Sequence, residues 1–338
     1  MRSPLFLAPL TAFCAAALFT TAAPAADVFQ GKTINVIVGF GPGGGYDTNA
    51  RVLARHMAGH IPGKPTMIVK NMPGAGSLKS VQYLRTTAPK DGTTIITFNF
   101  GQITSSRVMP NKKIQVDFRD FAWIGSISRD ISVCYVRKGI GGESLASLAK
   151  RPQVNFGLTS PGSASFFNQT MLREVFDVKL KQIAGYSGSK GKQIAVERGE
   201  LDGDCGAWSS VPDDWLKNKK IDVLLTFSPI RPNDMPKVVP FALDIAKTAD
   251  DKKIVTLLTG AAELGRPYIA PKELAADRLD IFRTAFTATM KDAAFNTEAK
   301  KLGLPVSPII GADAEATLKE IYDMPAAVVA KAKEMIKR

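Results

Sequence analysis

Short apolar runs alternate with amphipathic stretches along most of the chain. The run Ile34–Val38 ends in glycines, and residues 47–60 then place apolar side chains at helical spacing. Two further apolar runs, over 66–70 and 93–98, are separated by a helix that ends near Leu84. Apolar strands joined through helices are typical of a mainly parallel sheet that helices cover on both faces. We therefore predict an α/β fold.

The middle of the chain repeats this alternation, and the last third is mostly helical. No linker rich in glycine and serine separates the parts, so we expect two α/β lobes joined through strands, with crossings near 125–129 and 227–229. The remaining predicted strands lie at 123–128, 131–136, 153–158, 201–207 and 221–228, and the predicted helices at 144–150, 166–176, 190–198, 237–248, 274–293, 296–302 and 312–337.

The first 26 residues have the pattern of an export signal. Arg2 is the only charge before Asp27, and Ala23-Pro24-Ala25 is a cleavage pattern of small residues, with Ala26 an alternative last residue. A membrane anchor is the alternative, because 24 uncharged residues are long enough to span a bilayer. Abundant alanine and threonine, with three prolines, favour a signal that is cleaved near Ala25 or Ala26. We expect a soluble mature protein in the periplasm.

The net charge indicates which class of partner the protein binds, and the cysteines indicate whether it forms a disulfide or a metal site. Lys+Arg 44 against Asp+Glu 31 gives a net charge of +13, which favours an anionic partner. The basic residues are dispersed, so we expect no nucleic acid. Loss of Cys14 with the signal leaves Cys134 and Cys205, which either form one disulfide in an oxidising compartment or remain two buried thiols. Two cysteines without nearby histidines do not predict a metal site.

The sequence motifs give little support to an enzymatic function. The only histidines, His56 and His60, are one helical turn apart, and no G-x-S-x-G motif is present. Residues 39–44 match G-x-G-x-x-G after a strand, as in dinucleotide-binding dehydrogenases. The second strand, however, ends in Val69-Lys70-Asn71 without an acidic residue for a ribose, and Pro42 removes an N–H from the loop. We expect no catalytic residues and no cofactor.

Four loops rich in glycine and serine follow predicted strands, at 41–47, 73–77, 159–165 and 186–189. Small residues at a strand-to-helix turn let backbone N–H groups approach a ligand, and the helix start behind them carries about half a positive charge. Open α/β sheets bind ligands at the carboxyl ends of their strands. These loops therefore predict an anion-binding site.

Three segments of the chain resemble the solute-binding proteins of tripartite tricarboxylate transporters, the Bug family. They are Ile37–Asp47 (IVGFGPGGGYD), Asn71–Gly76 (NMPGAG) and Pro89–Thr93 (PKDGT), and the resemblance extends over essentially the whole mature chain. It implies the two-lobe fold of type II-like periplasmic binding proteins, with a ligand cleft between the lobes. Lobe I would comprise 27–126 and 229–338, and lobe II would comprise 127–228.

The resemblance also implies how a ligand is held. The loop at 41–47 would bind a carboxylate through backbone N–H groups, partly through water, and the loops at 159–165 and 186–189 would contact it from lobe II. The sequence departs from the family at Phe166, where a histidine is frequent, and at Lys190-Gly191-Lys192, which replaces an apolar segment. The candidate ligand-binding residues are Gly41, Gly43, Gly44, Gly45, Tyr46, Asp47, Gly74, Ala75, Gly76, Thr159, Ser160, Gly162, Ser163, Ser165, Tyr186, Ser187, Ser189 and Asp204.

The sequence thus predicts an extracytoplasmic receptor, not an enzyme, that closes on a small organic carboxylate and delivers it to the membrane permease subunits of a tripartite tricarboxylate-type transporter. Two alternatives stay open: a ligand-loaded subunit of a membrane sensor, and a nicotinamide-dependent dehydrogenase. We expect a monomer. Tyr46, Phe100, Phe166 and Trp208 are candidates either for an aromatic pocket wall or for the core.

Overall fold

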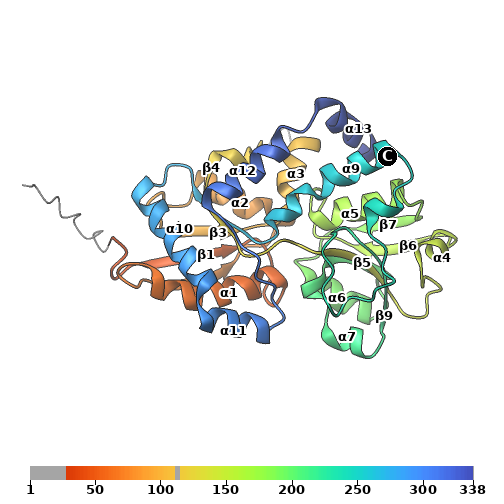
Figure 1. The fold of residues 1–338 in the computed structure, drawn as a ribbon, viewed down its shortest axis with the longest axis horizontal. Coiled ribbons are helices and arrows are strands. Elements are labelled where there is room, and N and C mark those ends of the chain that lie inside the picture. Colours follow the sequence, from red (N-terminus) through yellow and green to blue (C-terminus); the bar gives the residue numbers. More distant parts are fainter. Residues whose placement is uncertain (1–27, 111–114, 338) are drawn as a thin grey trace, which may run out of the picture.

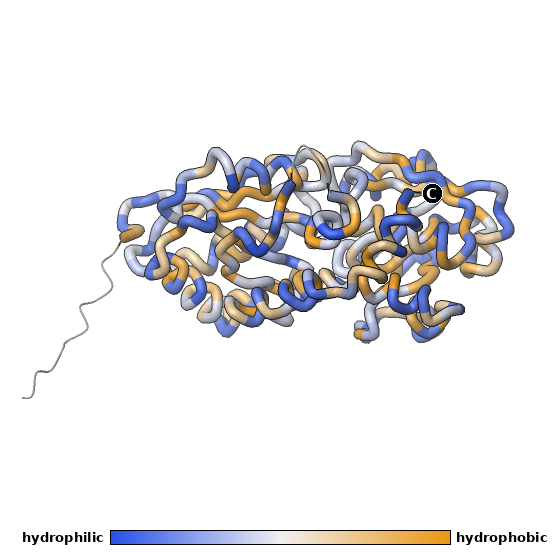
Figure 2. The backbone as a smooth tube through the Cα atoms, turned by 90° about the horizontal axis from the view of Figure 1, so that it is seen from above, coloured by the Kyte–Doolittle hydropathy of each residue, from blue (hydrophilic) through white to orange (hydrophobic). Residues whose placement is uncertain are grey.

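The computed structural model describes residues 28–110 and 115–337. The predicted export signal lies outside the described residues. The described chain forms two lobes side by side, each built on one sheet with helices packed around it (Figure 1). Seen from above, the molecule is elongated along the line that joins the lobes (Figure 2). Among the described residues, no helix combines the length and apolarity that crossing a membrane requires.

The first sheet has the strand order β11-β4-β10-β3-β1-β2. Strand β1 pairs in parallel with β2 and β3, whereas β10 runs antiparallel to both β3 and β4. The strands are β1 (Thr33–Val38), β2 (Thr66–Asn71), β3 (Thr94–Thr97), β4 (Phe121–Ser126), β10 (Pro267–Pro271) and β11 (Ile309–Ile310).

The second sheet has the order β7-β6-β8-β5-β9. Strand β6 pairs in parallel with β7 and β8, and β5 runs antiparallel to β8 and β9. The strands are β5 (Ser132–Arg137), β6 (Val154–Gly157), β7 (Leu180–Ile183), β8 (Gly203–Ala207) and β9 (Ile221–Thr226). The two-lobe α/β fold is confirmed. Both sheets are mixed, because β5 and β10, which arrive from the other lobe, and the short β11 run antiparallel to their neighbours.

Helices bury both faces of each sheet. Along β1, Val36 and Val38 point into one apolar cluster while Ile37 points into another, as the alternation of a strand requires. The helices are α1 (Gly45–Met57), α2 (Leu78–Thr86), α3 (Gly101–Val108), α4 (Leu145–Ala149), α5 (Ala164–Glu174), α6 (Ser189–Glu197), α7 (Asp213–Lys217), α8 (Ala242–Ile245), α9 (Ala249–Thr259), α10 (Ala276–Lys291), α11 (Ala293–Lys301), α12 (Gly311–Tyr322) and α13 (Ala326–Lys337).

The chain passes from the first sheet to the second through residues 127–131, between β4 and β5. After β9 it stays with the second sheet, because Ala242 of α8 and Val255 of α9 pack in the same apolar cluster as Phe156 of β6. It returns to the first sheet between α9 and β10. We therefore propose a return crossing at 260–266, later than the predicted 227–229, with α8 and α9 assigned to lobe II.

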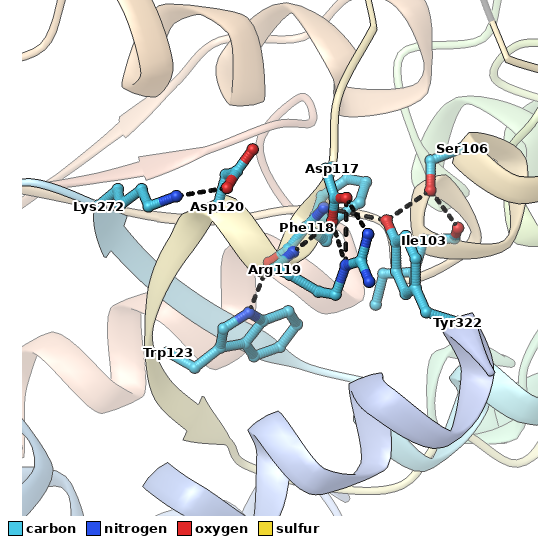
Figure 3. A network of polar contacts seen from close by, with 9 residues as sticks. All are labelled: Ile103, Ser106, Asp117, Phe118, Arg119, Asp120, Trp123, Lys272 and Tyr322. Carbon is cyan, nitrogen blue, oxygen red and sulfur yellow. Dashed lines mark hydrogen bonds and ion pairs between the residues drawn. The ribbon is translucent and has the colours of Figure 1, made fainter.

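The last two helices pack against different lobes, α13 against lobe II and α12 against lobe I, and so connect the two. Helix α13 packs against α9 through Val329 and Ala332, which belong to the core of lobe II. Helix α12 is fastened to lobe I by Tyr322 (Figure 3): its hydroxyl lies 2.7 Å from Ser106 Oγ and accepts a hydrogen bond from the Phe118 N–H (3.0 Å).

The two cysteines of the described residues lie opposite each other on β5 and β8 and form a disulfide, Cys134–Cys205. This is one of the two alternatives that the sequence left open. The bond joins strands that are 71 residues apart in sequence. Cys205 also lines the cavity between the lobes, so the disulfide fixes part of the cavity wall.

Candidate functional site

A cavity of about 70 Å³ lies between the lobes at the carboxyl ends of the strands. Among the described residues, four helices begin at its wall, each after a strand: α1 after β1, α3 after β3, α5 after β6 and α6 after β7. The first two belong to lobe I and the other two to lobe II. Because a helix start carries partial positive charge and free N–H groups, this arrangement suits an anion.

Two of these helix starts are open to a ligand. The N-cap residues of α1 and α6 are Gly44 and Gly188, and no side chain of the described residues caps either helix. The helices also face each other closely, because a Cβ on Gly44 would stand 3.0 Å from Ser189 Oγ. Glycine at this position therefore lets the two helix starts approach a single small group from opposite lobes.

The other two helix starts are bridged by one side chain. Asn99 Oδ1 accepts hydrogen bonds from the N–H of Gly101 in α3 (2.8 Å) and of Ala164 in α5 (3.0 Å). A backbone hydrogen bond from Gly41 N–H to Ser187 O (2.9 Å) joins the lobes near α6. The structure is therefore a closed form, which explains why the cavity is small.

Two buried ion pairs flank the cavity. Arg266 Nη1 lies 2.9 Å from Asp130 Oδ2, and Lys192 Nζ lies 2.7 Å from Asp204 Oδ1. Burial opposes the charge of Arg266, but the Asp130 carboxylate raises its pKa above the ordinary value, so Arg266 stays charged. Burial raises the pKa of Asp204 above its ordinary value, and the Lys192 ammonium opposes that rise. Arg266 and Lys192 both line the cavity.

Aromatic side chains form part of the wall. The Tyr46 ring stacks on Phe40, with ring centroids 4.7 Å apart, and the Arg266 guanidinium carbon lies 4.6 Å from the Tyr46 ring centre. Burial raises the pKa of Tyr46 well above its ordinary value, so its hydroxyl remains neutral. Of the candidate aromatics, Tyr46 and Phe100 line the cavity, whereas Phe166 and Trp208 pack in apolar clusters of lobe II.

Six of the predicted site residues line the cavity, and they come from both lobes: Gly44, Gly45, Tyr46, Thr159, Ser165 and Ser189. Five others line an adjoining pocket of about 230 Å³ that shares Phe40 and Thr159 with the cavity: Gly74, Ala75, Gly76, Tyr186 and Ser187.

The remaining candidates line neither the cavity nor the adjoining pocket. Ser163 caps α5, its Oγ accepting from the Phe166 N–H (3.3 Å) and donating to Ser160 O (2.8 Å). Gly162 turns the same loop with φ +84°. Asp204 is held by Lys192 and does not line the cavity.

Asp47 is buried and organises the loop before α1. Its carboxylate accepts hydrogen bonds from the Gly43 N–H (2.9 Å), from Arg51 Nε and Nη2 (2.9 Å each) and from Asn71 Nδ2 (2.8 Å). Burial would raise the pKa of Asp47, but these hydrogen bonds hold it below the ordinary value. Asp47 does not line the cavity, so it positions the backbone that does.

Sequence reasoning missed Arg266 and Asp130, and also Asn99 in the loop between β3 and α3. None lies in a glycine-rich loop, and the strand that follows Arg266 was not predicted. Lys192 departs from the family pattern, and this departure is a signal that the sequence itself carries. The two histidines line no part of the cavity: His56 Nε2 lies 2.8 Å from Glu298 Oε2, and His60 Nε2 lies 2.9 Å from Asp292 Oδ2.

The sheet orders, the crossings between the lobes and the interlobe cavity are those of a two-lobe, type II-like α/β fold. Solved periplasmic binding proteins share this fold. The periplasmic binding protein BugD matches with a TM-score of 0.72 and 22% identity, over 90% of this chain and 96% of that chain. MatC of Rhodopseudomonas palustris with bound malate matches with a TM-score of 0.69 and 18% identity, over 90% and 98%.

Sequence comparison agrees with the resemblance to Bug proteins. A UPF0065 protein of Bordetella pertussis is 26% identical over 192 residues, 55% of this chain and 58% of its own length. A UPF0065 protein of Cupriavidus necator is 43% identical over 83 residues, 24% of each chain. The chain thus spans less than two thirds of the length of these curated relatives. No family model matches. The predicted resemblance to Bug-type solute-binding proteins is confirmed by these likenesses.

Proposed function

We propose that this protein is an extracytoplasmic solute-binding receptor that captures a small organic carboxylate by closure of its two lobes. The observation that carries the proposal is the meeting of uncapped helix starts from both lobes, α1 and α6, at one cavity. Neither lobe alone surrounds the site, so a ligand held by both stabilises the closed form.

The strength of such a site agrees with a receptor. Charge-assisted hydrogen bonds contribute roughly 1.5–3 kcal/mol each. Five or six of them, less about 4 kcal/mol or more for immobilising the ligand, leave about 8 kcal/mol. That corresponds to a Kd of about 1 µM.

Structural relatives support the choice of ligand class. MatC was solved with malate, and another R. palustris protein of the same fold, with a TM-score of 0.70, was solved with adipate. Both ligands are small organic carboxylates. We further propose that the receptor acts in the periplasm, after removal of its export signal, that it performs no catalysis and that it delivers its ligand to the permease of a tripartite tricarboxylate-type transporter.

Thermal unfolding tests the binding role. The mature chain from Asp27 is unfolded, freed of any retained ligand and refolded, and is then heated with malate, adipate, citrate or benzoate, or with the amide of each acid. A carboxylate at 100 times its Kd should add about 2.7 kcal/mol to the free energy of unfolding, a shift of several degrees. Stabilisation by amides as great as by the acids would contradict the proposal.

A further inference from the structure

Arg266 occupies a distinctive place in the molecule, because it belongs both to the passage between the lobes and to the cavity wall. Its backbone N–H donates to Ser126 Oγ (3.0 Å), and its carbonyl accepts from the Ile127 N–H (3.1 Å). These contacts join the returning chain to the outgoing crossing at 127–131. The side chain is 4% exposed and lines the cavity.

Among the described residues, the hydrogen bonds of the Arg266 side chain are made by Nη1, and the guanidinium lies over the Tyr46 ring. Nη1 donates to Asp130 Oδ2 (2.9 Å) and to Gly265 O (2.9 Å). Nε–H is buried and meets no acceptor among the described residues. Nη2 lies beside the start of α1, 3.3 Å from the point where a Cβ on Gly45 would stand. A buried donor without an acceptor is costly, so an unused edge of this kind calls for a partner.

Elsewhere in the chain the same edge of an arginine binds a carboxylate. Arg51 donates to Asp47 through Nε (2.9 Å) and Nη2 (2.9 Å), one bond to each carboxylate oxygen. Such two-bond pairs combine strength with a planar geometry that lysine does not offer. In Arg266, Nη2 of the corresponding edge lies beside the uncapped start of α1, where an anion is favoured.

We propose that Arg266 determines the specificity of the receptor by binding a ligand carboxylate through its Nε and Nη2 edge, beside the first N–H groups of α1. The inference rests on the proposed function. Asp130 holds the other end of the guanidinium and so aims the free edge at the ligand. Because the same residue pins the two crossings together, a ligand on Arg266 also contacts the region about which the lobes close.

Arg266→Lys tests the proposal, because it keeps the charge beside Asp130 but removes the two-bond edge. Arg129→Lys is the matched control: Arg129 lies in the outgoing crossing, is 45% exposed, pairs with Glu263 and does not line the cavity. Isothermal titration uses whichever acid of malate, adipate, citrate and benzoate gives the largest thermal shift. We expect Arg266→Lys to weaken binding by about tenfold or more and Arg129→Lys to leave it unchanged.

A spectroscopic readout separates direct contact from a structural role. The Nε–H signal of Arg266, identified in a ¹H–¹⁵N spectrum by its loss in Arg266→Lys, should move when the acid is added. If the lysine variant is poorly folded, the pair Arg266→Met with Asp130→Asn removes both charges together, and it too should lose binding.

The outcomes distinguish the two proposals. Wild-type affinity in a folded Arg266→Lys protein, or an Nε–H signal that does not respond to the acid, would overturn the role of Arg266 and leave the receptor function standing. Failure of every acid to bind the refolded wild-type chain would overturn the proposed function itself.

Discussion

Gly44→Asp places a negative charge at the start of α1 with little disturbance of the fold. Gly44 has φ −89° and ψ 170°, a conformation that aspartate adopts freely, and aspartate is among the preferred N-cap residues. Its Cβ would stand 3.0 Å from Ser189 Oγ, so this hydroxyl must move by a few tenths of an ångström. The new carboxylate would cap α1 and occupy the place proposed for the ligand.

The expected loss of affinity is large. Two like charges about 4 Å apart, at an effective dielectric constant near 20, repel by about 4 kcal/mol, which is about a thousandfold in Kd. Titration with the best carboxylate should therefore show no measurable binding, while the unfolding temperature without ligand stays within a few degrees of wild type. Gly59→Asp is the control, because a Cβ there meets nothing within 4 Å and the residue lies in the short 3-10 helix Ala58–His60, after the end of α1. Undiminished binding by a folded Gly44→Asp protein would refute the assignment of the site to this helix start.

Three further predictions concern the framework of the site. Replacing Cys134 and Cys205 with serine should lower the free energy of unfolding by on the order of 4 kcal/mol, measured by denaturant titration, because the bond closes a long loop; an unchanged midpoint would show that the bond contributes nothing. The lowered pKa of Asp47 adds stability above about pH 4, and this stability is lost as the pH falls through the folded-state pKa. Asp47→Asn should therefore flatten this part of the curve of unfolding free energy against pH. An identical slope in the variant would contradict the stabilising role of the Asp47 carboxylate. Asn99→Ala removes the acceptor that the Ala164 N–H meets across the cleft, so it should favour the open form and raise the radius of gyration in small-angle scattering, which an unaltered radius would contradict.

Much of the scaffold was predictable because each early strand is a short apolar run that breaks into glycines. A glycine-rich loop precedes α1 as expected, but α1 begins at Gly45, two residues before the predicted start at 47, and Gly44 lines the cavity. Strand β10 was not predicted, since Pro267 and Pro271 bound a run of three apolar residues that looks like a loop. The predicted helix at 312–337 is two helices, because Pro325 interrupts it.

The candidate site was predictable as far as it depends on the backbone. Glycine and serine at strand ends indicated where N–H groups are exposed, which is a local property of the sequence. The contribution of Arg266 is not local: it arises from a return crossing that brings a residue 136 positions away from Asp130 into contact with it. Asp47 is a different case, because it lies in a segment that the sequence predicted to bind ligand, yet its carboxylate is buried and accepts hydrogen bonds from the Gly43 N–H and from Arg51.

A crystal structure of the refolded mature chain with the tightest-binding carboxylate tests the central claim most directly. The account predicts a closed form in which one carboxylate group lies between the starts of α1 and α6, with its oxygens within hydrogen-bond distance of backbone N–H groups from both lobes. A carboxylate bound to one lobe only, or at a distance from both helix starts, would contradict it.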